Sequence, residues 1–138
     1  MTIVVVTLLV LIGGLVWFAK SNQAPAVTDA NIVSKKGLHV HPELEIYVKG
    51  TQFFIPENIG LSRVEMAVHT HEDLPIIHLE FPGTVTKDDI RLKKFFEVWG
   101  KDFYELGTTV AMTVNGVPNT ELGNYIMNDK DKIVLRYE

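Results

Sequence analysis

The sequence predicts an α+β domain, with one helix packed on a mostly antiparallel sheet, that follows an N-terminal transmembrane helix. Several stretches alternate between apolar and polar residues, which is typical of strands with one buried face. A single later stretch carries a helix-like pattern, and the first part of the chain is a long uncharged apolar run. We therefore divide the chain into a membrane anchor (1–20), a linker (21–36) and a folded domain (37–138).

The apolar run covers residues 2–19 and contains no charged side chain. At about 1.5 Å per residue, a helix of this length spans a bilayer, and Trp17 and Phe18 fit the aromatic belt at its end. The alternative is a cleaved signal peptide, because residues 24–26 (APA) have the small-x-small form of a cleavage site. We favour a retained anchor, since the run is longer than a usual signal core. The predicted location is the cell membrane, with a single pass and the C-terminal domain outside the cytoplasm.

The composition excludes several classes of function. Acidic residues outnumber basic ones, 17 to 13, which argues against nucleic acid as a partner, because nucleic-acid binding requires a basic face. The chain contains no cysteine, which excludes disulfides, thiolate metal sites, iron–sulfur clusters and cysteine nucleophiles. The linker is polar, and we expect it to hold the domain away from the membrane surface.

The domain begins with a predicted strand over residues 38–48, in which alternate residues are apolar. Lys49-Gly50 is the turn, and residues 51–56 return as a second strand that Pro56 ends.

A second hairpin follows, with the strands VEMAVHTH and IIHLEF around a loop of four residues (72–75). If this loop closes symmetrically, His69 faces His78 and His71 faces Ile76. Directly opposed residues have Cβ atoms about 5 Å apart, so His69 and His78 are placed to share one ion.

One helix is predicted over residues 86–100. Thr86 and Asp89 have the spacing of a capping box, and Gly100 is a typical helix stop. A hairpin around Asn115-Gly116 comes next, and the chain ends with a polar turn and a last strand.

Two resemblances add to these patterns. The hairpin at VNG followed by NDKDKIVLRYE resembles the end of β-grasp (ubiquitin-like) domains, in which a polar turn precedes a last strand beside the helix. This resemblance covers the last third of the chain and implies a β-grasp-like fold. Most of the domain also resembles an uncharacterised group of small exported or membrane-anchored bacterial and archaeal domains, through the motifs HVHPELEIYVKG, IPENIG, HTHEDLPIIHLEFP and FFEVWG. The second resemblance implies an exported domain in which the two histidine stretches occur together, and it implies no activity.

The histidines all lie in two stretches, and each falls on the less apolar face of its strand. We predict that they form one metal site, whose ligands are His39, His41, His69, His71 and His78. Imidazole ligands without thiolate favour copper or zinc. Because this parity places the rings away from the core, replacing His69 and His78 should hardly change the stability of the metal-free protein.

Four nearby carboxylates, Glu43, Glu72, Asp73 and Glu80, are candidates for a fourth ligand or for orienting a ring. Met66 offers a thioether, which copper accepts, but it has the wrong parity on its strand.

The predicted function is metal capture, sensing or delivery by a membrane-anchored domain. One alternative is a structural or protein-interaction module on the cell surface, in which the histidines only line a polar strand face. Another is a metal-dependent hydrolase with Glu72 or Asp73 as general base. The sequence has no HExxH motif, nucleophile elbow or phosphate-binding glycine loop. We therefore favour a binding protein over an enzyme.

Overall fold

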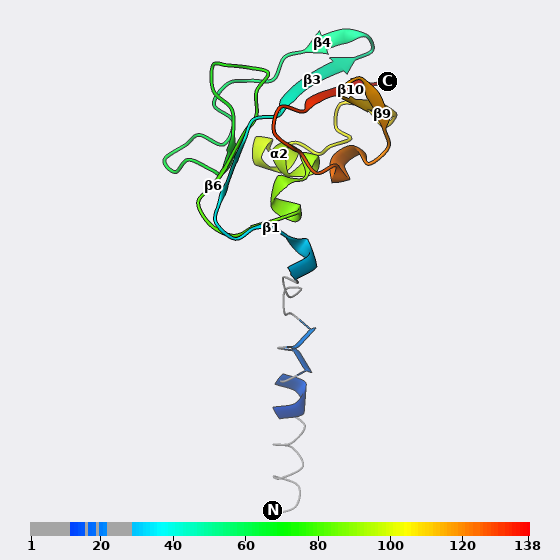
Figure 1. The fold of residues 1–138 in the computed structure, drawn as a ribbon. Coiled ribbons are helices and arrows are strands. Elements are labelled where there is room, and N and C mark those ends of the chain that lie inside the picture. Colours follow the sequence, from blue (N-terminus) through cyan, green and yellow to red (C-terminus); the bar gives the residue numbers. More distant parts are fainter. Residues whose placement is uncertain (1–11, 16, 19, 22–28) are drawn as a thin grey trace, which may run out of the picture.

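The computed structural model describes residues 12–15, 17–18, 20–21 and 29–138 (Figure 1). The predicted anchor therefore lies largely outside the described residues, and the part of it that is described is helical. No helix in the described part of the chain is long and apolar enough to cross a membrane. Four apolar side chains of this segment are exposed: Ile12, Leu15, Trp17 and Phe18. The transmembrane helix stays a prediction.

From residue 29 onward the chain folds into three sheets, with strand orders β1-β7, β4-β3-β10-β8-β9 and β2-β6-β5. The strands are β1 (Ile32–Ser34), β2 (Leu38–Val40), β3 (Glu43–Val48), β4 (Thr51–Phe53), β5 (Val68–His69), β6 (His78–Phe81), β7 (Val85–Thr86), β8 (Val110–Val114), β9 (Val117–Asn119) and β10 (Lys132–Tyr137). The helical elements are α2 (Leu92–Trp99) and the 3-10 turns η1 (Asp29–Asn31), η2 (Asp88–Ile90) and η3 (Leu122–Asn124). Among the described ladders β10 pairs in parallel with β3, and the others are antiparallel. The predicted α+β class with a mostly antiparallel sheet is confirmed.

Both predicted two-residue turns are confirmed, and both have the backbone that such hairpins need. Lys49 and Gly50 have φ angles of 49° and 79°, and Asn115 and Gly116 have φ angles of 53° and 80°. Positive φ at both central residues matches the right-handed twist of the flanking strands. These turns fix the β3–β4 and β8–β9 pairs of the five-stranded sheet.

The hydrophobic core lies between the five-stranded sheet and α2. Alternate residues of β3 and β10 are buried, which follows from the period of two in a strand. On α2, Leu92, Phe95 and Phe96 are buried in this core. Val68 and Leu79 of the three-stranded sheet join the same cluster. In the view of Figure 1, α2 lies between β6 and the β10 side of the domain. Burial of the apolar faces at about 25 cal/mol per Å² is the main stabilising term.

The predicted strand over residues 38–48 is wrong in one respect, because it is two strands in two different sheets. The break falls at His41 and Pro42, between β2 and β3. Proline has no N–H to donate to a ladder, and the carbonyl of Pro42 accepts a hydrogen bond from the N–H of Ile77. The same stretch therefore connects the histidine-bearing sheet to the core sheet.

The predicted helix over residues 86–100 begins later than expected. Thr86 donates from its N–H and its hydroxyl to Asp89, at 2.8 and 2.7 Å, so the predicted contact exists. It stabilises η2 rather than the α-helix, because Arg91 has an extended backbone and α2 begins after it. Gly100 ends α2 in the left-handed region with φ 77°, as predicted.

The predicted linker over residues 21–36 contains ordered structure in its described part. η1 lies there, and β1 pairs with β7 in the two-stranded sheet. The pairing was missed because a three-residue strand carries no detectable period. The folded part of the chain thus begins before residue 37.

Candidate metal centre

The five imidazole rings converge on the three-stranded sheet β2-β6-β5. His78 contacts three other rings, with centroid distances of 4.8 Å to His41, 4.8 Å to His71 and 5.2 Å to His69. His39 joins the group through His41, at 4.7 Å. The prediction that the two histidine stretches lie on the same side of the domain is confirmed.

Strand pairing places the two central rings. His69 of β5 and His78 of β6 are directly opposed, as the sequence predicted. The accompanying prediction that His71 faces Ile76 is wrong, because Ile76 forms its bridge with Glu43 instead. The ladder therefore ends at His69, and His71 follows it outside the regular strand.

His69 is buried, with 1% of its surface exposed. Its Nδ1 lies 2.8 Å from the backbone oxygen of Met66, so this nitrogen carries the proton and donates it. The other nitrogen, Nε2, then carries a lone pair. It is buried and has no hydrogen-bond partner among the described residues. The Glu65 carboxylate lies 3.3 Å from it without forming a hydrogen bond.

A covering loop, residues 58–66, closes over this face of the sheet. Asn58 donates its N–H to the carbonyl of Thr70, and Thr70 donates its own to the carbonyl of Ile59. Gly60 packs on His69 itself, since a Cβ built at Gly60 would lie 3.2 Å from the His69 Cβ. The prediction that all five rings lie on an outer face is therefore wrong for His69 and His78, which are both buried.

His78 is held between carboxylates. Its Nε2 lies 3.1 Å from both oxygens of Asp73, and its Nδ1 lies 3.3 Å from Oε1 of Glu80. The hydrogen bond from His78 holds the pKa of Asp73 below its usual range. Burial raises the pKa of Glu80, but the nearby His39 and His78 lower it by more, so that its pKa is also below the usual range. Both carboxylates are thus anionic at neutral pH.

His39 and His41 lie nearer the surface than His69 and His78. The Nε2 atoms of His39 and His41 are 3.1 Å apart, and Oε1 of Glu80 lies 3.2 Å from Nε2 of His39. Asp129 accepts a hydrogen bond from the backbone N–H of His41, at 2.9 Å, and lies 4.0 Å from its Nδ1. The backbone hydrogen bond holds the main chain of His41 beside Asp129.

Three sets of side chains bring their ligand atoms within 4.8 Å of one another in the described residues. The sets are His69, His71 and His78; His39, His41 and Glu80; and Glu65, His69 and Glu80. The predicted five-histidine cluster is thus two adjacent groups, with Glu80 common to the second and third sets. Metal binding at these residues stays a prediction.

Some predicted ligand candidates have other positions. Of the four carboxylates, Asp73 and Glu80 contact histidine, Glu43 bridges Ile76 through its backbone, and Glu72 is exposed. The exposed side chain of Met66 gives no evidence of a thioether ligand, whereas its backbone oxygen orients His69.

Two acidic neighbours of the histidines were missed from the sequence. Glu65 lies in the covering loop, and Asp129 is 88 residues away from His41 in the chain. No periodic pattern connects either residue to the histidines, because tertiary contacts bring them together.

Comparison with known proteins gives no further assignment: neither a protein-family model, nor a curated protein, nor a solved structure matches this chain.

Proposed function

We propose that this protein binds a transition metal ion through His69, His71 and His78. The observation that carries the proposal is the Nε2 atom of His69, which is buried and lacks a hydrogen-bond partner among the described residues. Leaving a buried polar atom unpaired costs about 1–3 kcal/mol. A bound cation removes this cost, and the Nδ1–H bond to a backbone oxygen is the usual way in which a metal-binding histidine is oriented.

The chemistry of the ligands favours copper or zinc. His69, His71 and His78 offer imidazole nitrogens, the neighbouring acidic residues offer carboxylate oxygens, and the chain has no thiolate. Three imidazoles leave room for a fourth ligand, and two carboxylates contact rings of this set: Asp73 at His78 and Glu65 at His69.

The biological role we propose is capture or delivery of this ion outside the cytoplasm, by a domain anchored through residues 2–19. The uncharged apolar run and the exposed apolar side chains in its described part support the anchor. The full chain, expressed in a bacterium, should remain with the membrane fraction after alkaline extraction. A soluble product that starts near residue 27 would contradict a retained anchor.

We further propose that the five-stranded sheet is of the β-grasp type. Support comes from the order β4-β3-β10-β8-β9, in which β3 and β10, the first and last strands of this sheet along the chain, are parallel neighbours. The connection from β4 to β8 contains α2, together with the added strands β5, β6 and β7.

Metal analysis of the full chain, purified in detergent without a histidine tag, tests the metal proposal. Wild-type protein should retain zinc or copper after dialysis. His69→Asn should retain less metal than wild type, because the Asn amide can still donate to the Met66 oxygen but has no atom at the position of Nε2. His71→Gln, at a partly exposed ring of the same set, should also retain less, whereas Glu45→Gln on β3 is a control that should retain as much as wild type. Wild-type protein that retains neither zinc nor copper after exposure to the ion and dialysis would contradict the proposal.

One observation favours the alternative of an interaction module. Phe54 is 78% exposed and follows the edge strand β4, where another chain can pair. If Phe54→Ser abolished a physiological association while the histidine variants did not, this alternative would replace the metal proposal.

A further inference from the structure

The second ligand set, His39, His41 and Glu80, lies beside the three-histidine position and has no role in the function proposed above. His39 lies on β2 and Glu80 on β6, and strand pairing makes these two residues directly opposed. His41 follows β2 at the break before β3. Two neighbouring strands thus bring the three side chains to one point.

The distances within this set suit a shared cation better than a shared proton. Ligand atoms 2.0–2.1 Å from a tetrahedral metal are roughly 3.3 Å from one another. Nε2 of His39 lies 3.1 Å from Nε2 of His41 and 3.2 Å from Oε1 of Glu80. A single ring proton on His39 can satisfy only one of these contacts well, whereas an ion between the three atoms satisfies all of them.

Glu80 lies between the two positions. Its Oε1 is 3.2 Å from Nε2 of His39 and 3.3 Å from Nδ1 of His78. Its carboxylate also belongs to a set with His69 and Glu65. A carboxylate that reaches ligands on both sides is the group that can bridge two metal ions.

The local charge compensates two cations. Besides Glu80, the carboxylates of Glu65, Asp73 and Asp129 contact the histidines from separate elements. Four carboxylates around the histidines place negative charge beside both positions, which lowers the repulsion between two divalent ions.

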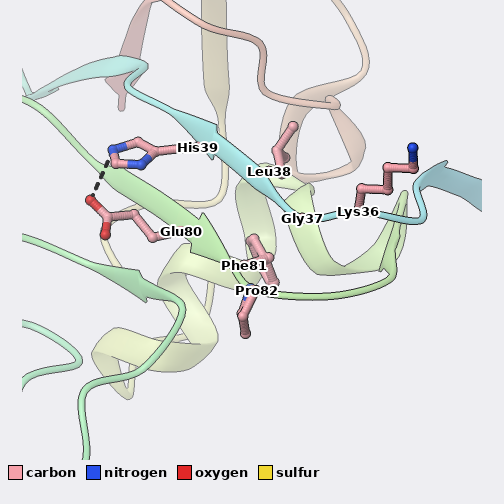
Figure 2. Close-up of a pocket in the computed structure, with 7 residues that line it drawn as sticks. All are labelled: Lys36, Gly37, Leu38, His39, Glu80, Phe81 and Pro82. Carbon is pink, nitrogen blue, oxygen red and sulfur yellow. Dashed lines mark ion pairs between the residues drawn. The ribbon is translucent and has the colours of Figure 1, made fainter.

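The second set is open to solvent, unlike His69. A cleft of about 540 Å³ adjoins it, lined by Lys36, Gly37, Leu38, His39, Glu80, Phe81 and Pro82. Figure 2 shows the ion pair of His39 and Glu80 at one end of this cleft and Lys36 at the other. An ion can therefore reach His39 directly from solution.

We infer that His39, His41 and Glu80 bind a second transition metal ion, and that Glu80 bridges it to the ion at His69, His71 and His78. The protein then has a two-ion centre, with an exposed position that exchanges readily and a buried position that exchanges slowly. The bridging role rests on the proposed function, because it requires the first ion.

The test is metal stoichiometry of the full chain in detergent, without a histidine tag, after equilibrium dialysis against buffered Zn²⁺ or Cu²⁺. Wild type should bind two ions per chain. The double variant His39→Ala/His41→Ala should bind one, and His69→Asn should bind one. The His39 side chain is 63% exposed and that of His41 36%, and circular dichroism checks that each variant is folded. Glu45→Gln is the matched control for Glu80→Gln and should keep two ions.

Electron paramagnetic resonance of the Cu²⁺-loaded chain tests the bridge. Two equivalents should give a dipolar-coupled spectrum, which Glu80→Gln or His39→Ala/His41→Ala should convert to that of an isolated ion. Two ions without coupling would show that Glu80 does not bridge them.

The remaining outcomes separate the two proposals. One ion that is lost in His69→Asn but kept in His39→Ala/His41→Ala would overturn the second site and leave the proposed function intact. One ion that is lost in both variants would mean a single five-histidine site, which also overturns the second site. No bound ion in wild type would overturn both proposals.

Discussion

His69 and His78 face each other across β5 and β6, with their ring planes 12° apart and their centroids 5.2 Å apart. The pairing places both rings on one side of the sheet, and the covering loop (58–66) encloses the His69 side. The surroundings of these rings are therefore partly shielded from water. Electrostatic interactions with a bound ion are stronger there than at an exposed site.

Because His69 and His78 are buried, the double variant His69→Ala/His78→Ala should be less stable than wild type even without metal. Each truncation leaves a cavity, and the first also removes the donor to the Met66 oxygen. We expect the metal-free variant to lose about 2–5 kcal/mol of unfolding free energy. Urea unfolding in the presence of a chelator measures this loss. An unchanged midpoint would show that the covering loop does not pack as the structure has it.

Gly60→Ala should disrupt the centre without touching a histidine. Gly60 has φ 73°, and an added Cβ would collide with the backbone oxygen of Val68 and press on the His69 Cβ. Gly50→Ala is the matched control, because Gly50 has φ 79° with no atom near the added Cβ. Both variants should lose about 1–2 kcal/mol from backbone strain, and Gly60→Ala should lose more and bind metal more weakly. Equal effects in thermal unfolding would argue against close packing of the loop on His69.

Metal affinity should fall as the pH falls. Imidazole binds metal only in its neutral form, so protons compete with the ion for the ring nitrogens as the pH falls. The pKa values of Asp73 and Glu80 are below their usual range, so these carboxylates stay ionised between pH 5 and 8 and do not cause the change. Binding isotherms at pH 7.5, 6.0 and 5.0 should show progressively weaker binding. A constant affinity over this range would exclude imidazole as the main ligand.

Asp131 should make the domain sensitive to acid. This buried carboxylate accepts hydrogen bonds from the Tyr125 hydroxyl at 2.7 Å, the Asn128 N–H at 2.8 Å and the Asn115 amide at 3.1 Å. Burial raises the pKa of Asp131, but the hydrogen bonds lower it by more, so the net pKa is below its usual value. A lowered folded-state pKa stabilises the fold above the unfolded-state pKa, near 3.9, and the contribution is lost as the pH falls through the folded-state value.

The variant Asp131→Asn should therefore be less stable than wild type by about 2 kcal/mol at pH 7. The difference should shrink when urea unfolding is repeated at pH 3 and below. The exposed Asp29, paired with Lys35, provides a control in which Asp29→Asn has little effect. A difference between Asp131→Asn and wild type that stayed constant with pH would contradict the role of the charge.

The sequence predicted the histidine register because a period of two and a short loop determine which residues oppose each other. It did not predict the break at Pro42, since Leu38, Val40, Leu44 and Ile46 keep the same parity across two sheets. Nor did it predict the burial of His69. The loop that covers His69 is held by long-range backbone bonds, which leave no periodic signal in the sequence.

The central claim is that Nε2 of His69 binds a metal ion, and thermal unfolding of the full chain at pH 7.5 tests it most directly. At free zinc or copper a hundredfold above the dissociation constant, the metal should stabilise the fold by roughly 2.7 kcal/mol. The melting temperature should then rise on the order of 10 °C. His69→Asn should gain clearly less from metal than wild type, because only the set His39, His41 and Glu80 remains to bind an ion. Wild-type protein that melts identically with and without either ion would contradict the claim.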